Sequence, residues 1–159
     1  MSLAIREARP DDREFLVRGN TEMARETEGL ALDAALIGPG VEAVLADPSL
    51  GRYFVAELDG VAVGQLMVTY EWSDWRNGMF WWIQSVFVEP GHRGQGVFSA
   101  LFRHVSGIAE RESGICGLRL YVERTNRGAQ SVYSHLGLHV SNYEIMERVF
   151  RGPESRRES

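Results

Sequence analysis

The sequence predicts a mixed α/β (α+β) fold, with a mostly antiparallel central sheet and flanking helices. Three observations predict it. Residues 52–88 have the pattern of three strands joined by short turns, residues 95–110 change to helical periodicity, and residues 116–122 return to the alternation of a strand. Together they indicate an antiparallel meander that continues into one β-α-β unit.

The N-terminal third predicts one strand followed by two helices. Residues 3–8 have the pattern of a short strand, and Pro10-Asp11-Asp12 supplies the acidic first turn of a helix that should run to about Arg25. A second helix is expected over 33–46. We expect Gly38-Pro39-Gly40 to interrupt or reshape it.

The central meander depends on two turn dipeptides. Asp59-Gly60 separates the strands 52–58 and 61–72, and Asn77-Gly78 precedes the strand 79–88. Both dipeptides favour the tight turns of β-hairpins because their residues tolerate positive φ. The strand 79–88 is apolar at almost every position, so we expect it to be buried on both faces.

The C-terminal third predicts a further helix and a last strand. The helix spans 126–136 and ends at Gly137, and the strand follows over 138–149. The complete order is β-α-α-β-β-β-α-β-α-β. We expect a single domain over 1–150 and a flexible polar tail over 151–159.

Composition argues against several classes of function. The chain has 159 residues and a formal net charge of −5, which disfavours a sequence-independent grip on nucleic acid. No apolar run is long enough for a membrane span and the N-terminus lacks the pattern of a signal peptide, so we expect a cytoplasmic protein without a membrane partner. The single cysteine and the spacing of the histidines predict no disulfide framework and no metal site.

The loop after the strand 79–88 has the features of an anion-binding site. Arg93-Gly94-Gln95-Gly96 leads directly into the next helix. Its glycines let a ligand approach the backbone, the first-turn amides have no intrahelical partners, and the helix dipole adds roughly half a positive charge. These features suit a pyrophosphate, to which Arg93 can add charge-assisted hydrogen bonds. A glycine-rich turn without a ligand is the alternative, since short glycine patterns also occur by chance.

The run Arg93-Gly94-Gln95-Gly96-Val97-Phe98 resembles the fingerprint of the GNAT superfamily of acetyl-CoA-dependent N-acetyltransferases, which is Arg or Gln, two residues, Gly, one residue, then Gly or Ala. Asn126, Ala129, Tyr133 and Gly137-Leu138 resemble a second motif of that family, and the element order matches over nearly the whole chain. Phe98 is a departure, because the family usually has a small residue there. One reading is that its ring points into the core while its amide still faces the cofactor.

The resemblance implies acetyl-CoA as co-substrate. The backbone of Val86 and Val88 would pair with the pantetheine arm, and the amides of the glycine loop would hold the pyrophosphate. The cofactor-binding residues implied in this way are Val86, Phe87, Val88, Arg93, Gly94, Gln95, Gly96, Val97, Phe98, Asn126 and Tyr133. The acceptor amine would attack the thioester directly, so it must lose a proton while the departing thiolate gains one.

Tyr133 is the candidate acid, because a phenol with a pKa near ~10 can protonate a nascent thiolate. A core tyrosine without a catalytic role is the alternative. For the base, Gln84 and Ser85 occupy the place where similar polyamine acetyltransferases carry a Glu-Asp pair. Neither is a useful base at neutral pH, so Glu71, Asp74 and a water chain held by Gln84 and Ser85 all stay open.

All four tryptophans lie within residues 70–82, among acidic side chains. Aromatic faces beside carboxylates could bind a cationic amine, and the candidate acceptor residues are Glu28, Trp72, Asp74, Trp75 and Trp82. Core packing, hairpin packing or a dimer surface are the alternatives.

The function expected from these residues is acetyl transfer to the primary amine of a small molecule. A CoA-binding module without catalysis and an enzyme that acetylates a protein N-terminus or lysine are the alternatives. A homodimer is a further expectation from the resemblance.

Overall fold

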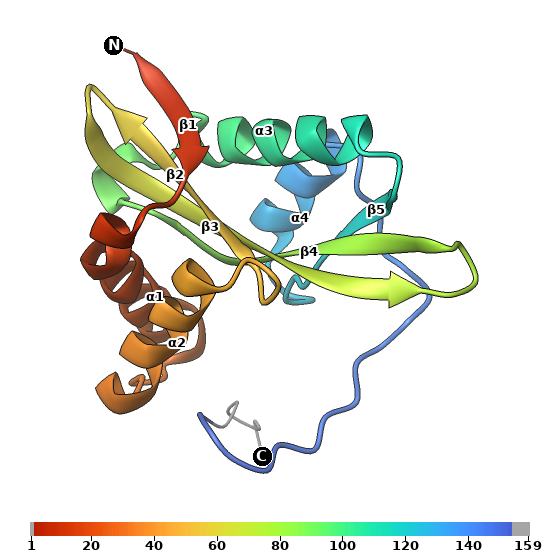
Figure 1. The fold of residues 1–159 in the computed structure, drawn as a ribbon, viewed down its shortest axis with the longest axis horizontal. Helices are drawn as coiled ribbons and strands as arrows, with labels where there is room; N and C mark the ends of the chain where they lie inside the picture. Colours follow the sequence, from red (N-terminus) through yellow and green to blue (C-terminus); the bar gives the residue numbers. More distant parts are fainter. Residues whose placement is uncertain (1, 154–159) are drawn as a thin grey trace.

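The computed structural model describes residues 2–153, which form one sheet with helices on both sides (Figure 1). The elements are β1 (Leu3–Glu7), α1 (Arg13–Glu28), α2 (Ala34–Ala46), β2 (Arg52–Leu58), β3 (Val61–Ser73), β4 (Gly78–Val88), α3 (Val97–Arg111), β5 (Ile115–Leu120) and α4 (Arg127–His135). Short 3-10 turns at Pro10–Asp12 and Pro90–His92 precede α1 and α3.

The sheet has the strand order β1-β2-β3-β4-β5, and only the β4–β5 pair is parallel. This mixed, mostly antiparallel sheet with flanking helices confirms the predicted fold class. The predicted turn at Asp59-Gly60 has the backbone that such a turn needs, since φ is 50° at Asp59 and 81° at Gly60. The predicted two-residue turn at Asn77-Gly78 is wrong: residues 74–77 form the connection, Asn77 has a φ of 47°, and Gly78 already pairs with Ser73 as the first residue of β4.

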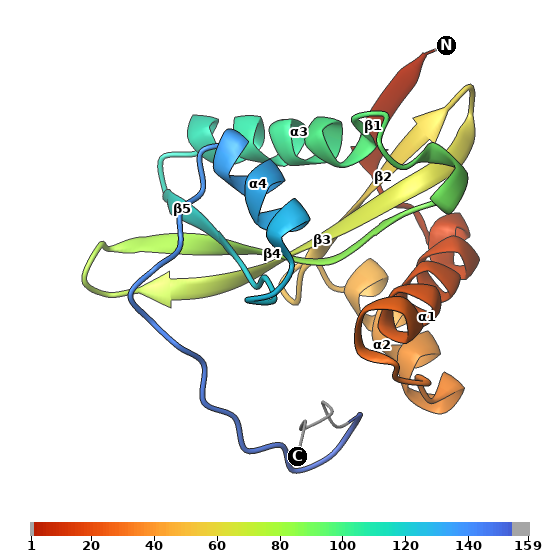
Figure 2. The same ribbon diagram turned by 180° about the vertical axis from the view of Figure 1, so that it is seen from behind.

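Helices cover both faces of the sheet, which the opposite views of Figure 1 and Figure 2 show. On one face α3 packs through a core that includes Leu101 and Val105, and α4 lies beside it. On the other face α1 and α2 contribute Leu16 and Val41 to a second cluster, which packs against Val55 of β2. The sheet therefore separates two apolar cores.

α1 is longer than predicted, whereas α2 has nearly its predicted extent but lacks the expected interruption. α1 continues beyond Arg25 and ends only at Gly29, whose φ of 62° is the left-handed conformation that terminates a helix. α2 is not interrupted: it runs through Pro39, and its N-cap Asp33 accepts a hydrogen bond from the backbone amide of Ala35 at 2.9 Å. A proline in a helix loses one backbone hydrogen bond, and α2 continues despite that loss.

The last predicted strand is wrong, because residues 138–149 are irregular and mostly exposed. Alternation favours a strand only where a neighbouring strand supplies hydrogen-bond partners. Within residues 2–153 β5 pairs with β4 alone, so the segment after α4 has joined no edge of the sheet. Figure 1 shows this segment leaving the body of the molecule. Most of the tail predicted from Arg151 lies outside the described residues.

β4 and β5 separate toward one end of the sheet. Their pairing runs from Met79 opposite Ile115 to Ile83 opposite Leu120 and then stops. Ser85, with a φ of 50°, and the nearby register shift against β3 mark a β-bulge at this point. Beyond the bulge, the described residues provide no strand partner for the edge of β4 that faces β5. The backbone of β4 is therefore open toward a ligand there.

Candidate active site

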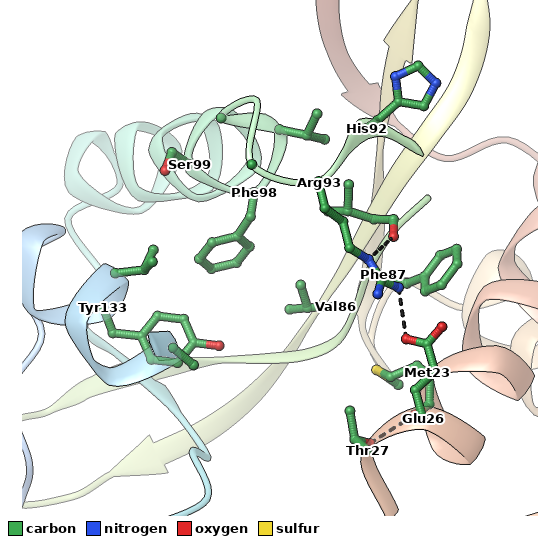
Figure 3. A pocket seen from close by; sticks show the side chains of 16 residues that line it. Met23, Glu26, Thr27, Val86, Phe87, His92, Arg93, Phe98, Ser99 and Tyr133 are labelled. Atoms are coloured by element: carbon green, nitrogen blue, oxygen red, sulfur yellow. Dashed lines mark hydrogen bonds and ion pairs between the residues drawn. The ribbon is translucent and has the colours of Figure 1, made fainter. Parts of the chain in front are cut away.

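A cavity of about 420 Å³ opens beside the end of β4 (Figure 3). The end of β4, the loop after it and the first turn of α3 form one wall, and α4 and α1 form the others. The structure gathers most of the predicted cofactor-binding residues around this cavity: Val86, Phe87, Val88, Arg93, Gly94, Gly96, Val97, Phe98 and Tyr133. Gln95 and Asn126 do not line it.

The glycine loop fits an anionic ligand. Gly94 has a φ of 74° and Gly96 a φ of 81°, which explains why neither carries a side chain. A Cβ built on either residue would meet no atom within 4 Å, so the space beside the backbone is open. Gly96 is the N-cap of α3, where the unpaired first-turn amides of a helix favour a phosphate.

Arg93 is held toward α1. Its Nη2 lies 2.8 Å from Oε2 of Glu26, and its Nε donates to the carbonyl of Val88 at 2.9 Å (Figure 3). A phosphate ligand would therefore compete with Glu26 for this guanidinium. The carbonyl of Val88, which the resemblance assigns to the pantetheine arm, already accepts one hydrogen bond.

Two residues of the α1 wall, Met23 and Thr27, are parts of the site that the sequence did not predict. Met23, Glu26 and Thr27 line the cavity, whereas the predicted acceptor residue Glu28 does not. The spacing of Met23 and Thr27, four residues apart, would place them on one helix face. We missed this signal because the predicted helix ended near Arg25, before the face was complete.

Tyr133 reaches the cavity from α4, and burial raises the pKa of its phenol above the ordinary value. The ring of Phe98 lies 5.6 Å from the ring of Tyr133, with the planes 72° apart. The ring of Phe98 therefore lines the cavity instead of pointing wholly into the core. Asn126 has a local role: its Oδ1 accepts a hydrogen bond from the amide of Ala129 at 3.1 Å and caps α4.

Glu71 is engaged by two donors outside the cavity. Trp82 donates from its indole nitrogen to Oε1 at 3.0 Å, and Arg119 donates to Oε2 at 2.6 Å. Trp82 also packs against Tyr121, with ring centroids 4.5 Å apart. Arg119 was not a predicted site residue. The alternation of the strand 116–122 could have placed it on the face opposite the apolar residues of β5.

The bulge of β4 is held by a buried residue of β3. Gln65 is 0% exposed, and its Nε2 donates to the carbonyl of Ser85 at 3.0 Å. Its Oε1 has no hydrogen-bond partner among the described residues. Neither Ser85 nor its neighbour Gln84, which donates to the hydroxyl of Thr69, lines the cavity. Gln65 thus fixes the backbone one residue before Val86, and only its polarity within an apolar strand could have indicated it.

The hairpin tip between β3 and β4 lies far from the cavity. Trp75 is 86% exposed there, and Asp74 accepts a hydrogen bond from its backbone amide at 3.0 Å. From this tip to Val86 the strand extends about 25 Å at the usual rise per residue. The structure therefore does not bring Trp72, Asp74 and Trp75 to the cavity, although the sequence grouped them as acceptor residues.

Two further properties concern the part of the chain that the structure describes. Residues 2–153 contain no helix that is both long and apolar enough to cross a membrane. In the same range no three His, Cys, Asp or Glu side chains are grouped so that they could hold a metal ion.

Known proteins share both the sequence and the fold. Residues 12–138 match the sequence model of the Acetyltransferase (GNAT) family. Streptothricin acetyltransferase from Streptomyces lavendulae is 38% identical over 87 residues, which are 54% of this chain and 43% of that protein. Thialysine N-ε-acetyltransferase from Bos taurus is 32% identical over 75 residues, which are 47% of this chain and 43% of that protein. The matched segments span less than half of either relative.

A solved structure matches along nearly the whole chain. A possible acetyltransferase from Clostridium difficile 630 superposes with a TM-score of 0.88 at 41% identity, over 95% of this chain and 99% of that one. All the residues that line the cavity lie within residues 12–138, which match the family model. This chain therefore belongs to the GNAT family of acetyltransferases.

Proposed function

We propose that the protein transfers the acetyl group of acetyl-CoA to the primary amine of a small molecule by direct attack on the thioester. The observation that carries the proposal is that one cavity joins the open edge of β4, the glycine loop before α3 and the phenol of Tyr133. The loop suits the pyrophosphate, and the backbone of Val86 suits the amides of the pantetheine arm. An acetyl group at the end of that arm would lie within the same cavity as the phenol.

Tyr133 is the proposed acid. Because burial raises the pKa of its phenol, the group stays protonated at neutral pH and can donate as the carbon–sulfur bond breaks. Its proton then passes to the thiolate sulfur of CoA. We expect Tyr133→Phe to lower kcat about 10²-fold, the effect of removing a general acid, and to leave the acetyl-CoA Kd within about threefold. Unchanged turnover would remove Tyr133 from the mechanism.

We propose that the acceptor amine loses its proton without a dedicated base from the protein. Glu26, the carboxylate of the cavity lining, pairs with Arg93, and both oxygens of Glu71 accept hydrogen bonds. Deprotonation at pH 7 costs roughly 4–5 kcal/mol for a lysine-like amine with a pKa of ~10.4, but only about 1 kcal/mol for an α-amine near ~8. A weakly basic amine is therefore the favoured acceptor. Its proton would pass to water.

An acetyl-CoA consumption screen tests the function. It should include amino acids, polyamines, aminoglycosides and the two acceptors for which the relatives are named, streptothricin and thialysine. We expect turnover with at least one small amine and a rate that rises with pH through the pKa of that amine. Tight CoA binding without turnover would favour a CoA-binding module, and turnover with peptides alone would favour a protein acetyltransferase.

A homodimer is the proposed assembly, and the C-terminal arm (residues 139–153) supports it. The arm exposes large apolar side chains such as Val140, Tyr143 and Phe150, and Met146 is 97% exposed. β5 also has a free edge within the described residues, and such an edge can pair with a strand of a second copy. Sedimentation velocity should show a dimer, and Met146→Lys with Val140→Lys should shift it toward monomer. A monomeric wild-type chain would contradict the proposal.

The cytoplasmic location also stays a prediction.

A further inference from the structure

Tyr133 lies on a helix that has little packing of its own. α4 is nine residues long, and none of the nine is fully buried. Burial raises the pKa of the phenol, and within residues 2–153 no hydrogen bond holds its hydroxyl. The position of the ring therefore depends on the side chains that pack against it.

Phe98 provides such a contact. Its ring meets the ring of Tyr133 edge to face at 5.6 Å, the arrangement that aromatic pairs prefer. The ring of Phe98 also lies 6.1 Å from the ring of Phe102, a residue of α3 that is 4% exposed and belongs to the core. Figure 3 shows Phe98 extending from the start of α3 toward Tyr133. Three rings thus connect the core to the phenol.

The contact depends on a large side chain at this position. A Gly or Ala at residue 98, the usual choice in the fingerprint that the sequence resembles, would end at or before Cβ and could not reach the ring of Tyr133. Val97, the preceding residue, is buried and anchors the same turn of α3 in the core. The first turn of α3 therefore faces the glycine loop and also supports the tyrosine across the cavity.

We propose that Phe98 is a positioning residue that fixes the phenol of Tyr133 for proton transfer. The proposal rests on the acid role of Tyr133 in the proposed function. Catalytic geometry is sensitive to displacement, and a shift of about 1 Å can cost about 100-fold in rate. We expect a smaller displacement than this, and a loss of about tenfold in kcat, when the ring of Phe98 is removed.

A double-mutant cycle tests the proposal with the full chain. The variants are Phe98→Ala, Phe98→Leu, Tyr133→Phe and the double variant Phe98→Ala/Tyr133→Phe. For each, kcat is measured with the best acceptor of the screen, and the Kd of acetyl-CoA is measured by calorimetry. We expect Phe98→Ala to lower kcat about tenfold, Phe98→Leu to lower it less, and the double variant to equal Tyr133→Phe.

A pH profile separates positioning from general loss of structure. Burial keeps the phenol protonated, so removal of the neighbouring ring admits water and should move the alkaline limb of kcat to lower pH. A merely destabilised protein would lose active molecules without moving this limb. Circular dichroism confirms that each variant is folded at the assay temperature.

The outcomes distinguish the two proposals. If Tyr133→Phe has no effect on kcat, the acid role fails, and the positioning role of Phe98 fails with it. If Tyr133→Phe is strongly impaired but Phe98→Ala is not, only the positioning role is overturned. It is also overturned if Phe98→Ala lowers kcat equally in both backgrounds, or if it changes only the Kd of acetyl-CoA, because the ring would then act independently of Tyr133.

Discussion

Gly19 and Gly107 should respond with opposite sign to the same substitution. Both are inside α-helices, where Ala is more favourable than Gly by about 1 kcal/mol. At Gly107 of α3, a Cβ would meet only the Nη1 atom of Arg111, at 3.4 Å and at the end of a flexible side chain. Gly107→Ala should therefore stabilise the protein by about 0.5–1 kcal/mol.

At Gly19 of α1 a new Cβ has no room. It would overlap Oε1 of Gln65, and it would lie 2.9 Å from Cδ of the same residue and 3.0 Å from Cδ1 of Phe87. Overpacking of this kind costs about 1–3 kcal/mol. The amide of Gln65 can move away only by losing its hydrogen bond to Ser85, at a further cost of about 1 kcal/mol. After the gain in helix propensity, Gly19→Ala should destabilise by about 2 kcal/mol.

Urea denaturation and thermal unfolding of both variants provide the assay. For a chain of 159 residues, the melting temperature changes by about 2–4 °C for each kcal/mol, so Gly19→Ala should lower it by about 4–8 °C and Gly107→Ala should raise it by about 1–4 °C. Gly19→Ala should also raise the KM for acetyl-CoA, because Gln65 holds the backbone beside Val86. A Gly19→Ala protein as stable as the wild type would show that Gln65 moves freely and would refute the reasoning.

Two further substitutions separate structural from catalytic roles. The hydrogen bonds from Arg6 lower the pKa of Asp12 in the folded protein. The pair therefore stabilises the fold at pH values above the pKa that Asp12 has in the unfolded chain, and this stabilisation is lost as the pH falls through its pKa in the folded protein. Asp12→Asn should cost about 2 kcal/mol at pH 7, and urea titrations should show the difference from wild type shrinking below pH ~4. Glu71→Gln should change kcat less than about threefold, because the carboxylate oxygens of Glu71 already accept hydrogen bonds from Trp82 and Arg119. Loss of a general base would instead lower kcat at least about 10²-fold.

Local sequence signals predicted much of the fold because they act over a few residues. Asp59 and Gly60 adopt the positive φ that their turn requires, Asn77 has a positive φ at the end of the next connection, and Gly94 and Gly96 do the same in the loop before α3. The same loop and the residues Val86–Val88 and Tyr133 line one cavity, as the resemblance implied. Each of these predictions needed only a short pattern and the order of the elements.

Long-range pairing accounts for the errors. Residues 138–149 alternate like a strand, but no neighbouring strand accepts them among the described residues. The sequence also did not indicate that Arg119, 48 residues later in the chain, lies 2.6 Å from the carboxylate of Glu71. Hydrogen-bond partners brought together by the sheet cannot be read from local periodicity.

The bulge at Ser85 affects both the pairing of β4 in the sheet and the candidate active site. A non-glycine residue in the left-handed region costs roughly 1–2 kcal/mol, and nothing in the apolar run around Ser85 requires that conformation. The hydrogen bond from buried Gln65 offsets part of this cost, and Gly19 leaves the space that Gln65 needs. The same distortion coincides with the end of the β4–β5 pairing and leaves the backbone of Val86 open. Without the bulge at Ser85, β4 would be expected to stay paired with β5, and its backbone would then not be open to a cofactor.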